Sequence, residues 1–226
     1  MRLFFGFDVT SEIRSQLSTV QTWLQSQGVR AGNWSRPELF HLTLLFIGDT
    51  SEENVSVLSE MGKATAAQAS PFEIHFDLPG MFERNRILWY GIQEDSGMTL
   101  MSEVHRRITG LAKKEAFIKV DERPFRPHLT LARKLDTASI PLMRDILAQC
   151  RPRDLARSST NVPSSDGLSS ASKGVFGSGD DASSQQGVKM IPPVSTLHVN
   201  SICLFESRQI NGRLMYPIVE RYEFGS

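Results

Sequence analysis

The sequence predicts an α+β fold made of two similar lobes, and two observations support this prediction. The tetrapeptide His-Leu-Thr-Leu occurs twice, at residues 41–44 and 128–131. The order of apolar segments around the two copies is also repeated, which indicates duplication of a half-domain. A two-fold relation between the halves brings both tetrapeptides to one shared place. We therefore predict a pseudo-two-fold, bilobal molecule.

Each half has the same order of elements. A strand-like run is followed by an amphipathic helix, the tetrapeptide, a second helix and a second strand-like run. In the first half these segments are residues 2–9, 12–27, 41–44, 52–68 and 72–78. In the second half they are residues 86–92, 98–115, 128–131, 137–150 and 196–206. The duplicated order favours two α+β lobes over one parallel sheet.

The helices are predicted from their periodicity and from the residues at their starts. In the first helix, apolar residues recur every three or four positions, as on the buried side of a helix. These residues are Ile13, Leu17, Val20 and Leu24. Thr10 or Ser11 can cap this helix, and Ser51 precedes the acidic pair Glu52 and Glu53 at the start of the next one.

One segment, residues 158–187, departs from the repeated pattern. Half of its residues are Ser or Gly, and it has few apolar side chains. Such a segment buries too little surface to offset the entropy lost on ordering. We predict a flexible insertion within one two-lobed domain that spans residues 1–226.

Composition limits the partners. The chain has 25 Lys and Arg against 25 Asp and Glu, so it has no bulk positive field for capturing long nucleic acids. Any RNA contact is therefore expected to be local. No stretch approaches the roughly 20 apolar residues that span a bilayer, and the apolar run at the start is too short for a signal peptide. We predict a cytoplasmic monomer that does not bind a membrane.

The two tetrapeptides carry the candidate chemistry. In an extended strand, side chains alternate between faces, so His41 and Thr43 share one face and the two leucines the other. His128 and Thr130 are arranged in the same way. Two facing imidazoles can take a proton from water and give one to a leaving oxygen, while hydroxyls stabilise charge on a phosphate. A lone histidine is more often structural, but a repeated pair with matching threonines favours catalysis.

Arg133 is the cation nearest to the second motif. It lies five positions after His128, so strict alternation turns it away from the histidine unless the strand bends or bulges. A solvated arginine is the alternative.

The sequence lacks the motifs that are typical of other catalytic chemistries. A catalytic zinc usually has three protein ligands, and neither motif has a carboxylate or cysteine at ligand spacing. No G-x-S-x-G elbow, Walker loop or dinucleotide fingerprint is present. We predict no metal and no cofactor. His75, His105 and His198 have no repeated partners, so we predict structural roles for them.

The two motifs, His41-Leu-Thr-Leu44 and Pro127-His-Leu-Thr-Leu-Ala-Arg133, resemble the double H-x-T motif of the 2H phosphoesterases. Within that superfamily the chain resembles the bacterial and archaeal RNA 2′,3′-cyclic phosphodiesterases, also named 2′-5′ RNA ligases. The resemblance extends to residues 2–5, 44–48 and 204–207, with Gly212 and Tyr216. The serine- and glycine-rich segment departs from the usual compact form.

This resemblance implies two antiparallel sheets around a central cleft, with helices outside. It also implies metal-free hydrolysis of an RNA-terminal 2′,3′-cyclic phosphate to a 2′-phosphomonoester. Carried over from the family, His41 is the proton donor and His128 the proton acceptor. Thr43 and Thr130 of the two motifs, with Arg133 at the position of the family's arginine, are expected to bind the substrate.

The sequence leaves three other functions possible. One is a 2′-5′ RNA ligase, which runs the same chemistry in reverse, and another is a cyclic phosphodiesterase acting on small nucleotides. The third is a non-catalytic module that binds RNA ends or oligonucleotides, against which the intact histidines and threonines argue. The sequence does not identify the residue that stacks on a base, and its candidates are Trp34, Trp89, Tyr90 and Phe125.

Overall fold

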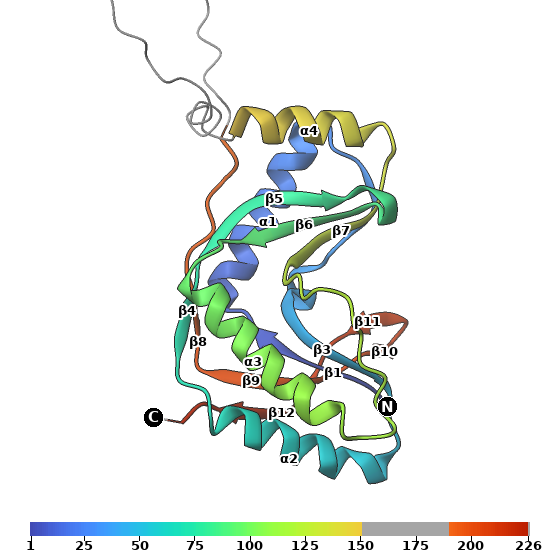
Figure 1. Cartoon of the computed structure of the whole chain (residues 1–226). Helices are drawn as coiled ribbons and strands as arrows, with labels where there is room; N and C mark the ends of the chain where they lie inside the picture. Colours follow the sequence, from blue (N-terminus) through green and yellow to red (C-terminus); the bar gives the residue numbers. More distant parts are fainter. Residues whose placement is uncertain (151–189, 226) are drawn as a thin grey trace, which may run out of the picture.

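Two four-stranded antiparallel sheets face each other in the computed structural model, which describes residues 1–150 and 190–225 (Figure 1). The first sheet consists of β12 (Ile218–Glu223), β9 (Ser201–Glu206), β1 (Arg2–Asp8) and β3 (His41–Asp49), in that order. The second consists of β2 (Ala31–Trp34), β7 (Leu129–Leu135), β6 (Ile87–Ile92) and β5 (Phe76–Phe82). The predicted insertion at 158–187 lies outside the described residues.

The two sheets are built alike, which confirms the predicted two-lobed α+β architecture. β1 pairs with β3 as β6 pairs with β7. The next strand in each sheet comes from the other half of the chain, since β9 joins β1 and β5 joins β6. Two short strands, β4 (Phe72–Ile74) and β8 (Leu197–Val199), pair with each other where the halves meet.

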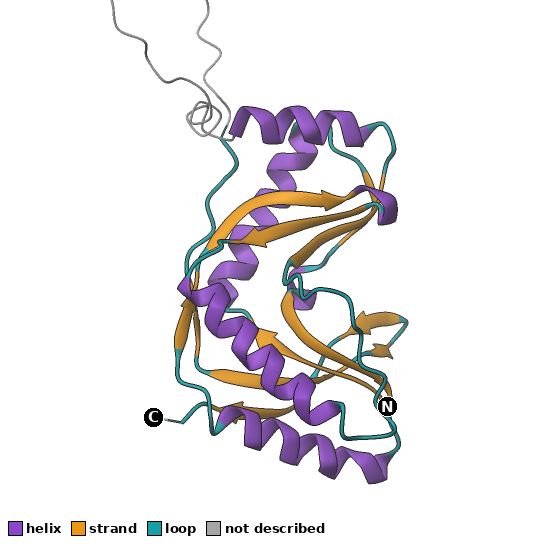
Figure 2. Ribbon diagram, in the orientation of Figure 1, coloured by secondary structure: helices purple, strands orange, loops and turns teal. Residues whose placement is uncertain are grey.

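The four α-helices of the described residues lie outside the sheets, as predicted (Figure 2). They are α1 (Ser11–Ser26), α2 (Val55–Ala66), α3 (Ser96–Ala112) and α4 (Ser139–Cys150). α2 and α3 pack together on the first sheet, and α4 packs on β5 of the second. α1 reaches the second sheet, where the side-chain amide of Gln21 donates to the Leu131 carbonyl in β7 at 2.8 Å. The core between helices and sheets includes the four motif leucines, each at most 3% exposed.

Some element boundaries differ from the predicted ones. The predicted strand 72–78 is divided at His75 into β4 and β5, and the predicted strand 196–206 is divided at Asn200 into β8 and β9. The predicted helix 52–68 begins with a 3₁₀ turn before α2. Thr10 caps α1, where its hydroxyl accepts from the Ile13 backbone N–H at 3.2 Å.

Four strands were not predicted. β2 and β12 extend the two sheets, and β10 (Arg208–Ile210) and β11 (Arg213–Met215) form a hairpin. The hairpin turns at Asn211 and Gly212, which both have positive φ, as a tight two-residue hairpin turn requires. Within the described parts of the chain, no helix is both long and apolar enough to cross a membrane.

Candidate active site

The two motifs occupy equivalent positions in the two sheets. His41 opens β3, and His128 directly precedes β7. Thr43 pairs with Gly6 of β1, and Thr130 pairs with Trp89 of β6. The histidines and threonines are half-buried on the inner faces of the sheets, while the leucines between them are buried toward the helices. The predicted division of each motif between two faces is therefore confirmed.

Both imidazoles are held in the same way. Nδ1 of His41 lies 2.8 Å from the Leu39 carbonyl oxygen, and Nδ1 of His128 lies 2.8 Å from that of Arg126. A carbonyl oxygen only accepts, so Nδ1 carries the hydrogen in both rings. Nε2 of His41 is 3.0 Å from the Thr43 hydroxyl, which donates to it when the ring is neutral. The shared tautomer leaves both Nε2 atoms for proton exchange with a ligand.

Aromatic side chains enclose the His41 ring. Phe4 and Tyr216 lie with their ring centroids 4.8 Å and 4.9 Å from it, and Phe205 lies at 5.9 Å. A pocket of about 240 Å³ opens at this point and is lined by Asp8, Arg14, Glu38, Leu39, Phe40, His41, Phe205, Tyr216 and Ile218. His41 therefore lies at a pocket that is lined by both apolar and charged side chains.

The His128 ring packs on Phe82 at 5.1 Å and on Trp89 at 6.3 Å. Trp89 lies over Gly80 of the neighbouring strand, where a Cβ atom would come within 2.3 Å of the indole. Glycine at this position makes room for the Trp89 ring, which then supports His128.

Each motif is followed by a β-bulge. Thr43 and Leu45 face Gly6 and Phe5, which leaves Leu44 unpaired, and Leu131 is left over in the same way between Thr130 and Ala132. A bulge inserts one residue and shifts the alternation of side chains. Two consecutive residues are therefore buried after each threonine.

The shift resolves the orientation of Arg133. Strict alternation would turn this side chain away from His128, but the bulge places it on the inner face with Thr130. Arg133 is exposed, and its charge lowers the pKa values of both His41 and His128. Arg133 therefore lies close enough to both imidazoles to interact with them electrostatically.

Both histidines are neutral at pH 7 in the free protein. Burial is the main cause that lowers the pKa of His41, to about 4, against the hydrogen bond to Leu39, which raises it. The charges of Arg14 and Arg133 lower it further, as does that of His128 when its ring is protonated. Burial also lowers the pKa of His128, with a smaller effect in the same direction from Arg133.

These shifts predict a pH dependence. His41 titrates at its ordinary value of 6.5 when unfolded and at about 4 when folded, so protonation favours the unfolded chain. The stability from neutral His41 is complete above pH 6.5 and is lost as the pH falls toward 4. In an NMR titration, the His41 midpoint is expected near pH 4 and should rise when inorganic phosphate binds. A midpoint near 6.5 in the free protein contradicts this prediction.

Two residues near His41 were missed by the sequence analysis. The Arg14 guanidinium donates to the carbonyls of Pro37 at 2.7 Å and Phe40 at 3.0 Å, and it pairs with Asp8. Asp8 also accepts from Arg221 at 2.9 Å. This network ties α1 and β12 to the turn that orients His41. No sequence signal marked it, because Arg14 and Asp8 belong to no repeated motif.

The other histidines lie outside the two motifs. His75 Nδ1 is 2.8 Å from an Asp95 carboxylate oxygen, and His198 Nδ1 is 3.1 Å from one of Glu73. His105 stacks on Phe125 at 3.9 Å. Among the residues that the structure describes, no group of three or more His, Cys, Asp or Glu side chains is arranged to hold a metal ion.

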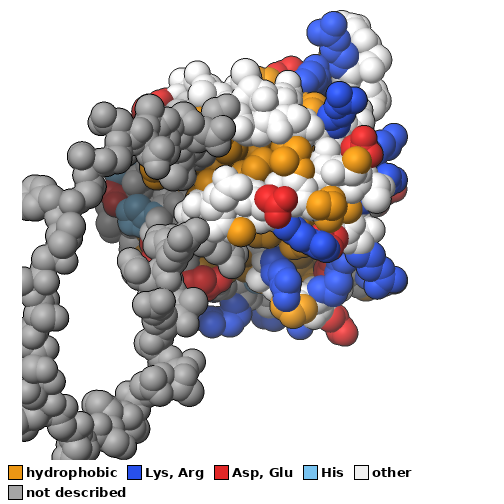
Figure 3. All heavy atoms as spheres, turned by 90° about the horizontal axis from the view of Figure 1, so that it is seen from above, with side chains coloured by type: hydrophobic (Ala, Val, Ile, Leu, Met, Phe, Trp, Pro, Cys, Tyr) orange, Lys and Arg blue, Asp and Glu red, His pale blue; other side chains and the backbone are white. Residues whose placement is uncertain are grey.

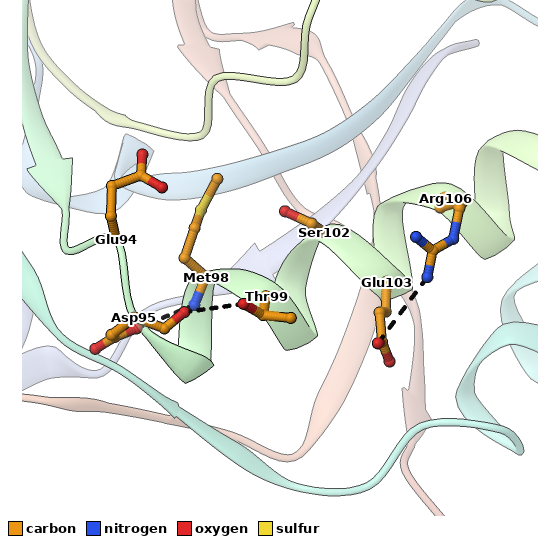
Figure 4. Close-up of a pocket in the computed structure, with 7 residues that line it drawn as sticks. All are labelled: Glu94, Asp95, Met98, Thr99, Ser102, Glu103 and Arg106. Carbon is orange, nitrogen blue, oxygen red and sulfur yellow. Dashed lines mark hydrogen bonds and ion pairs between the residues drawn. The ribbon is translucent and has the colours of Figure 1, made fainter.

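A separate hollow of about 340 Å³ lies along α3 (Figure 4). It is lined by Glu94, Asp95, Met98, Thr99, Ser102, Glu103 and Arg106. The lining has three carboxylates and one arginine, and Arg106 is itself 4.0 Å from Glu103. The net negative charge of this lining is unfavourable for binding a phosphate. Neither motif contributes a residue to the hollow.

Comparison with known families identifies the chain. A family model of the 2′-5′ RNA ligase superfamily matches residues 15–160. The chain belongs to the 2′-5′ RNA ligase superfamily. This confirms the resemblance seen in the two motifs.

Relatives of this superfamily member include proteins named RNA 2′,3′-cyclic phosphodiesterase. The one from Archaeoglobus fulgidus is 32% identical over 59% of the chain and 72% of its own length. The one from Escherichia coli K12 is 32% identical over 61% and 74%. The Geobacillus stearothermophilus relative is 32% identical over 58% of the chain, but the match spans only 41% of that protein.

Solved structures have the same fold as this superfamily member. E. coli LigT in its apo form has a TM-score of 0.65 at 21% identity, covering 100% of this chain and 98% of LigT. A protein from Thermus thermophilus has a TM-score of 0.60 at 21% identity, covering 99% and 98%.

Proposed function

We propose that this protein hydrolyses the 2′,3′-cyclic phosphate at an RNA terminus to a 2′-phosphomonoester, using two histidines and no metal. The observation that carries the proposal is the pair of H-x-T motifs on two facing sheets, with the same ring tautomer in both. Relatives that are 32% identical are named for this activity.

In the proposed mechanism, His128 is the base and His41 the acid. Nε2 of His128 takes a proton from water, whose oxygen attacks phosphorus. The bond from phosphorus to O3′ breaks, and Nε2 of His41 gives its proton to O3′, leaving a 2′-phosphate and a 3′-hydroxyl. The hydroxyls of Thr43 and Thr130 and the Arg133 guanidinium stabilise the charge on the non-bridging oxygens.

The low pKa of His41 makes its acid role depend on the substrate. In the free protein, burial and the positive charges of Arg14 and Arg133 keep this ring neutral at pH 7. An anionic phosphate beside Nε2 offsets these positive charges and favours the protonated ring. Substrate binding thus supplies the protonation state that the acid requires, while His128, also neutral, is ready to act as a base.

Arg133 is expected to bind the phosphate. Arg133→Gln should weaken phosphate binding about tenfold or more and lower the salt dependence of RNA binding. The log–log slope should fall by about 0.7, the contribution of one phosphate contact on a single strand. The matched control is Lys134→Gln, which removes the neighbouring exposed cation. Equal effects of the two substitutions would mean that Arg133 contributes only general charge.

The proposed substrates are RNA termini and short oligonucleotides, bound by a cytoplasmic monomer. Lys and Arg equal Asp and Glu in number. On the face drawn in Figure 3, basic side chains gather on the side away from the grey segment and are interspersed with acidic ones. This distribution supports contact with a terminal phosphate and one or two nucleotides rather than with a long backbone.

The proposal is tested by incubating the protein with a nucleoside 2′,3′-cyclic phosphate in the presence of EDTA and identifying the product isomer. A 2′-phosphate is the expected product. Formation of the 3′-isomer, or loss of activity in EDTA with recovery on adding a divalent ion, would overturn the mechanism.

A further inference from the structure

A short crossing segment, residues 35–40, connects the two sheets immediately before the first motif. It follows β2 of the second sheet and precedes β3 of the first. In the described parts of the chain, no strand pairing joins the two four-stranded sheets to each other. The place of His41 relative to His128 therefore depends in part on how the crossing segment is held.

Helix α1 holds the crossing segment with two side chains. The Gln21 amide donates to the Ser35 carbonyl at 2.8 Å. The Arg14 guanidinium donates to the carbonyls of Pro37 at 2.7 Å and Phe40 at 3.0 Å, and the second of these directly precedes the first motif. The two side chains lie about 10 Å apart along the helix axis, or two turns. Figure 1 shows α1 running from the first sheet to the second, so one helix binds both ends of the segment.

Gln21 also holds the second motif. The same amide nitrogen donates to the Leu131 carbonyl at 2.8 Å, and Leu131 is the residue left over at the bulge after Thr130. The Ser35 backbone N–H donates to this carbonyl as well, at 2.8 Å. A carbonyl only accepts, so both hydrogens of the amide group are used. One side chain thus joins the start of the crossing segment to the strand that follows His128.

This glutamine lies on the apolar side of α1, where hydrophobic packing alone does not call for an amide. Gln21 is 6% exposed. Its neighbours on this side of the helix, each 0% exposed, are Leu17, Val20 and Leu24. A buried amide costs free energy unless it is hydrogen-bonded. The two carbonyls that it binds are therefore the reason for a polar side chain at this position.

We infer that Gln21 and Arg14 are positioning residues for the reaction. By fixing the crossing segment, they set the place of the His41 ring relative to the His128 ring. This inference rests on the proposed function, in which both rings act on one phosphate. A displacement of about 1 Å at such a site can lower turnover about 100-fold. Alignment of acid and base matters only in the transition state, so its loss lowers kcat and leaves KM nearly unchanged.

Gln21→Met tests the inference, because methionine fits the apolar side of α1 but donates no hydrogen bond. With adenosine 2′,3′-cyclic phosphate, this variant should have a kcat lowered about 10- to 100-fold and a KM changed by less than about threefold. The matched control is Gln25→Met, the same substitution at an exposed position of α1, which should leave kcat unchanged. The inference is wrong if Gln21→Met keeps the kcat of the unmodified protein.

Arg14→Lys is the second variant. Lysine keeps the positive charge beside His41, but an ammonium group does not reproduce the fixed fork with which the guanidinium binds two carbonyls and Asp8. It should lower kcat as Gln21→Met does. Full activity in Arg14→Lys would show that only the charge of Arg14 matters, against a positioning role for this residue.

A His128→Ala background separates positioning from a general loss of structure. Without the His128 ring there is no pair to align, so Gln21→Met should lower the residual kcat by less than about twofold, as for residues that act as a unit. An equal fold-change in both backgrounds would mean that Gln21 only supports the fold, and this result would overturn the inference.

A measurement without turnover distinguishes this inference from the proposed function. When inorganic phosphate is titrated into the unmodified protein, the NMR signals of the His41 and His128 rings should shift together, because one ion contacts both. Gln21→Met should abolish this joint response, and Gln25→Met should keep it. If the unmodified protein shows the joint response but hydrolyses no cyclic phosphate, the proposed function fails, and loss of the response in Gln21→Met still supports the positioning role. An unchanged joint response in Gln21→Met contradicts it.

Discussion

Replacing His41 or His128 with alanine is expected to lower kcat/KM on a nucleoside 2′,3′-cyclic phosphate by roughly 10²–10⁴-fold, the usual contribution of a positioned acid or base. Each imidazole is oriented by a carbonyl 2.8 Å from Nδ1, so the loss removes a group that is already in place. The double variant should be little worse than either single one, because the two rings act as a unit.

Initial rates with a saturating and a limiting substrate concentration measure this loss. The matched control is His198→Ala, which removes an exposed histidine outside the motifs and should leave turnover unchanged. Turnover close to that of the unmodified protein in either motif variant would refute the two-histidine mechanism. If a substitution lowers the free energy of unfolding by more than it raises the activation free energy, the ring has a structural role.

Gly6→Ala is expected to have the second largest effect. A Cβ atom at Gly6 would lie 2.5 Å from the Leu42 carbonyl oxygen, and this atom belongs to the backbone between His41 and Thr43. β3 must therefore move away from β1. Overpacking of this kind costs about 1–3 kcal/mol, more than the roughly 0.4–1 kcal/mol that alanine gains by restricting the unfolded chain. A displacement approaching 1 Å at the site can lower turnover about 100-fold.

Denaturant unfolding and steady-state kinetics on the same preparation measure both effects. Gly110→Ala is the matched control, because a Cβ atom at this exposed position in α3 meets no atom within 4 Å. It should leave turnover unchanged and stabilise the helix by about 0.5–1 kcal/mol. If Gly6→Ala behaves like Gly110→Ala, the close approach of β1 and β3 does not position the site.

Much of the site could be predicted from the sequence because it depends on local alternation. Within one strand, side chains at alternate positions point to opposite faces. This alternation correctly separated His41 and Thr43 from their leucines. The duplication then indicated that His128 and Thr130 lie in an equivalent place. The α+β class followed from apolar periodicity and the repeated order of elements, whereas the placement of the helices outside the sheets was implied by the resemblance to the 2H phosphoesterases.

The remaining features depend on partners that are distant in the chain. The bulge at Leu131 exists only in the pairing of β7 with β6, so the alternation of side chains alone misplaced Arg133. β2 has only four residues and pairs with β7, about a hundred positions away, and its own residues carry little strand signal. The Arg14–Asp8–Arg221 network likewise depends on tertiary contacts.

The pairing of β1 with β9 has a consequence for biosynthesis. β1 leaves the ribosome long before its neighbours β9 and β12, which begin at Ser201 and Ile218. Contacts between such distant segments form slowly, because the entropy of closing the long loop is lost before the strands gain their pairing interactions. The second sheet contains only segments made before residue 136 and can form earlier. The lobe that holds His41 is therefore completed last, and a nascent chain can have a folded His128 lobe before it has a functioning enzyme.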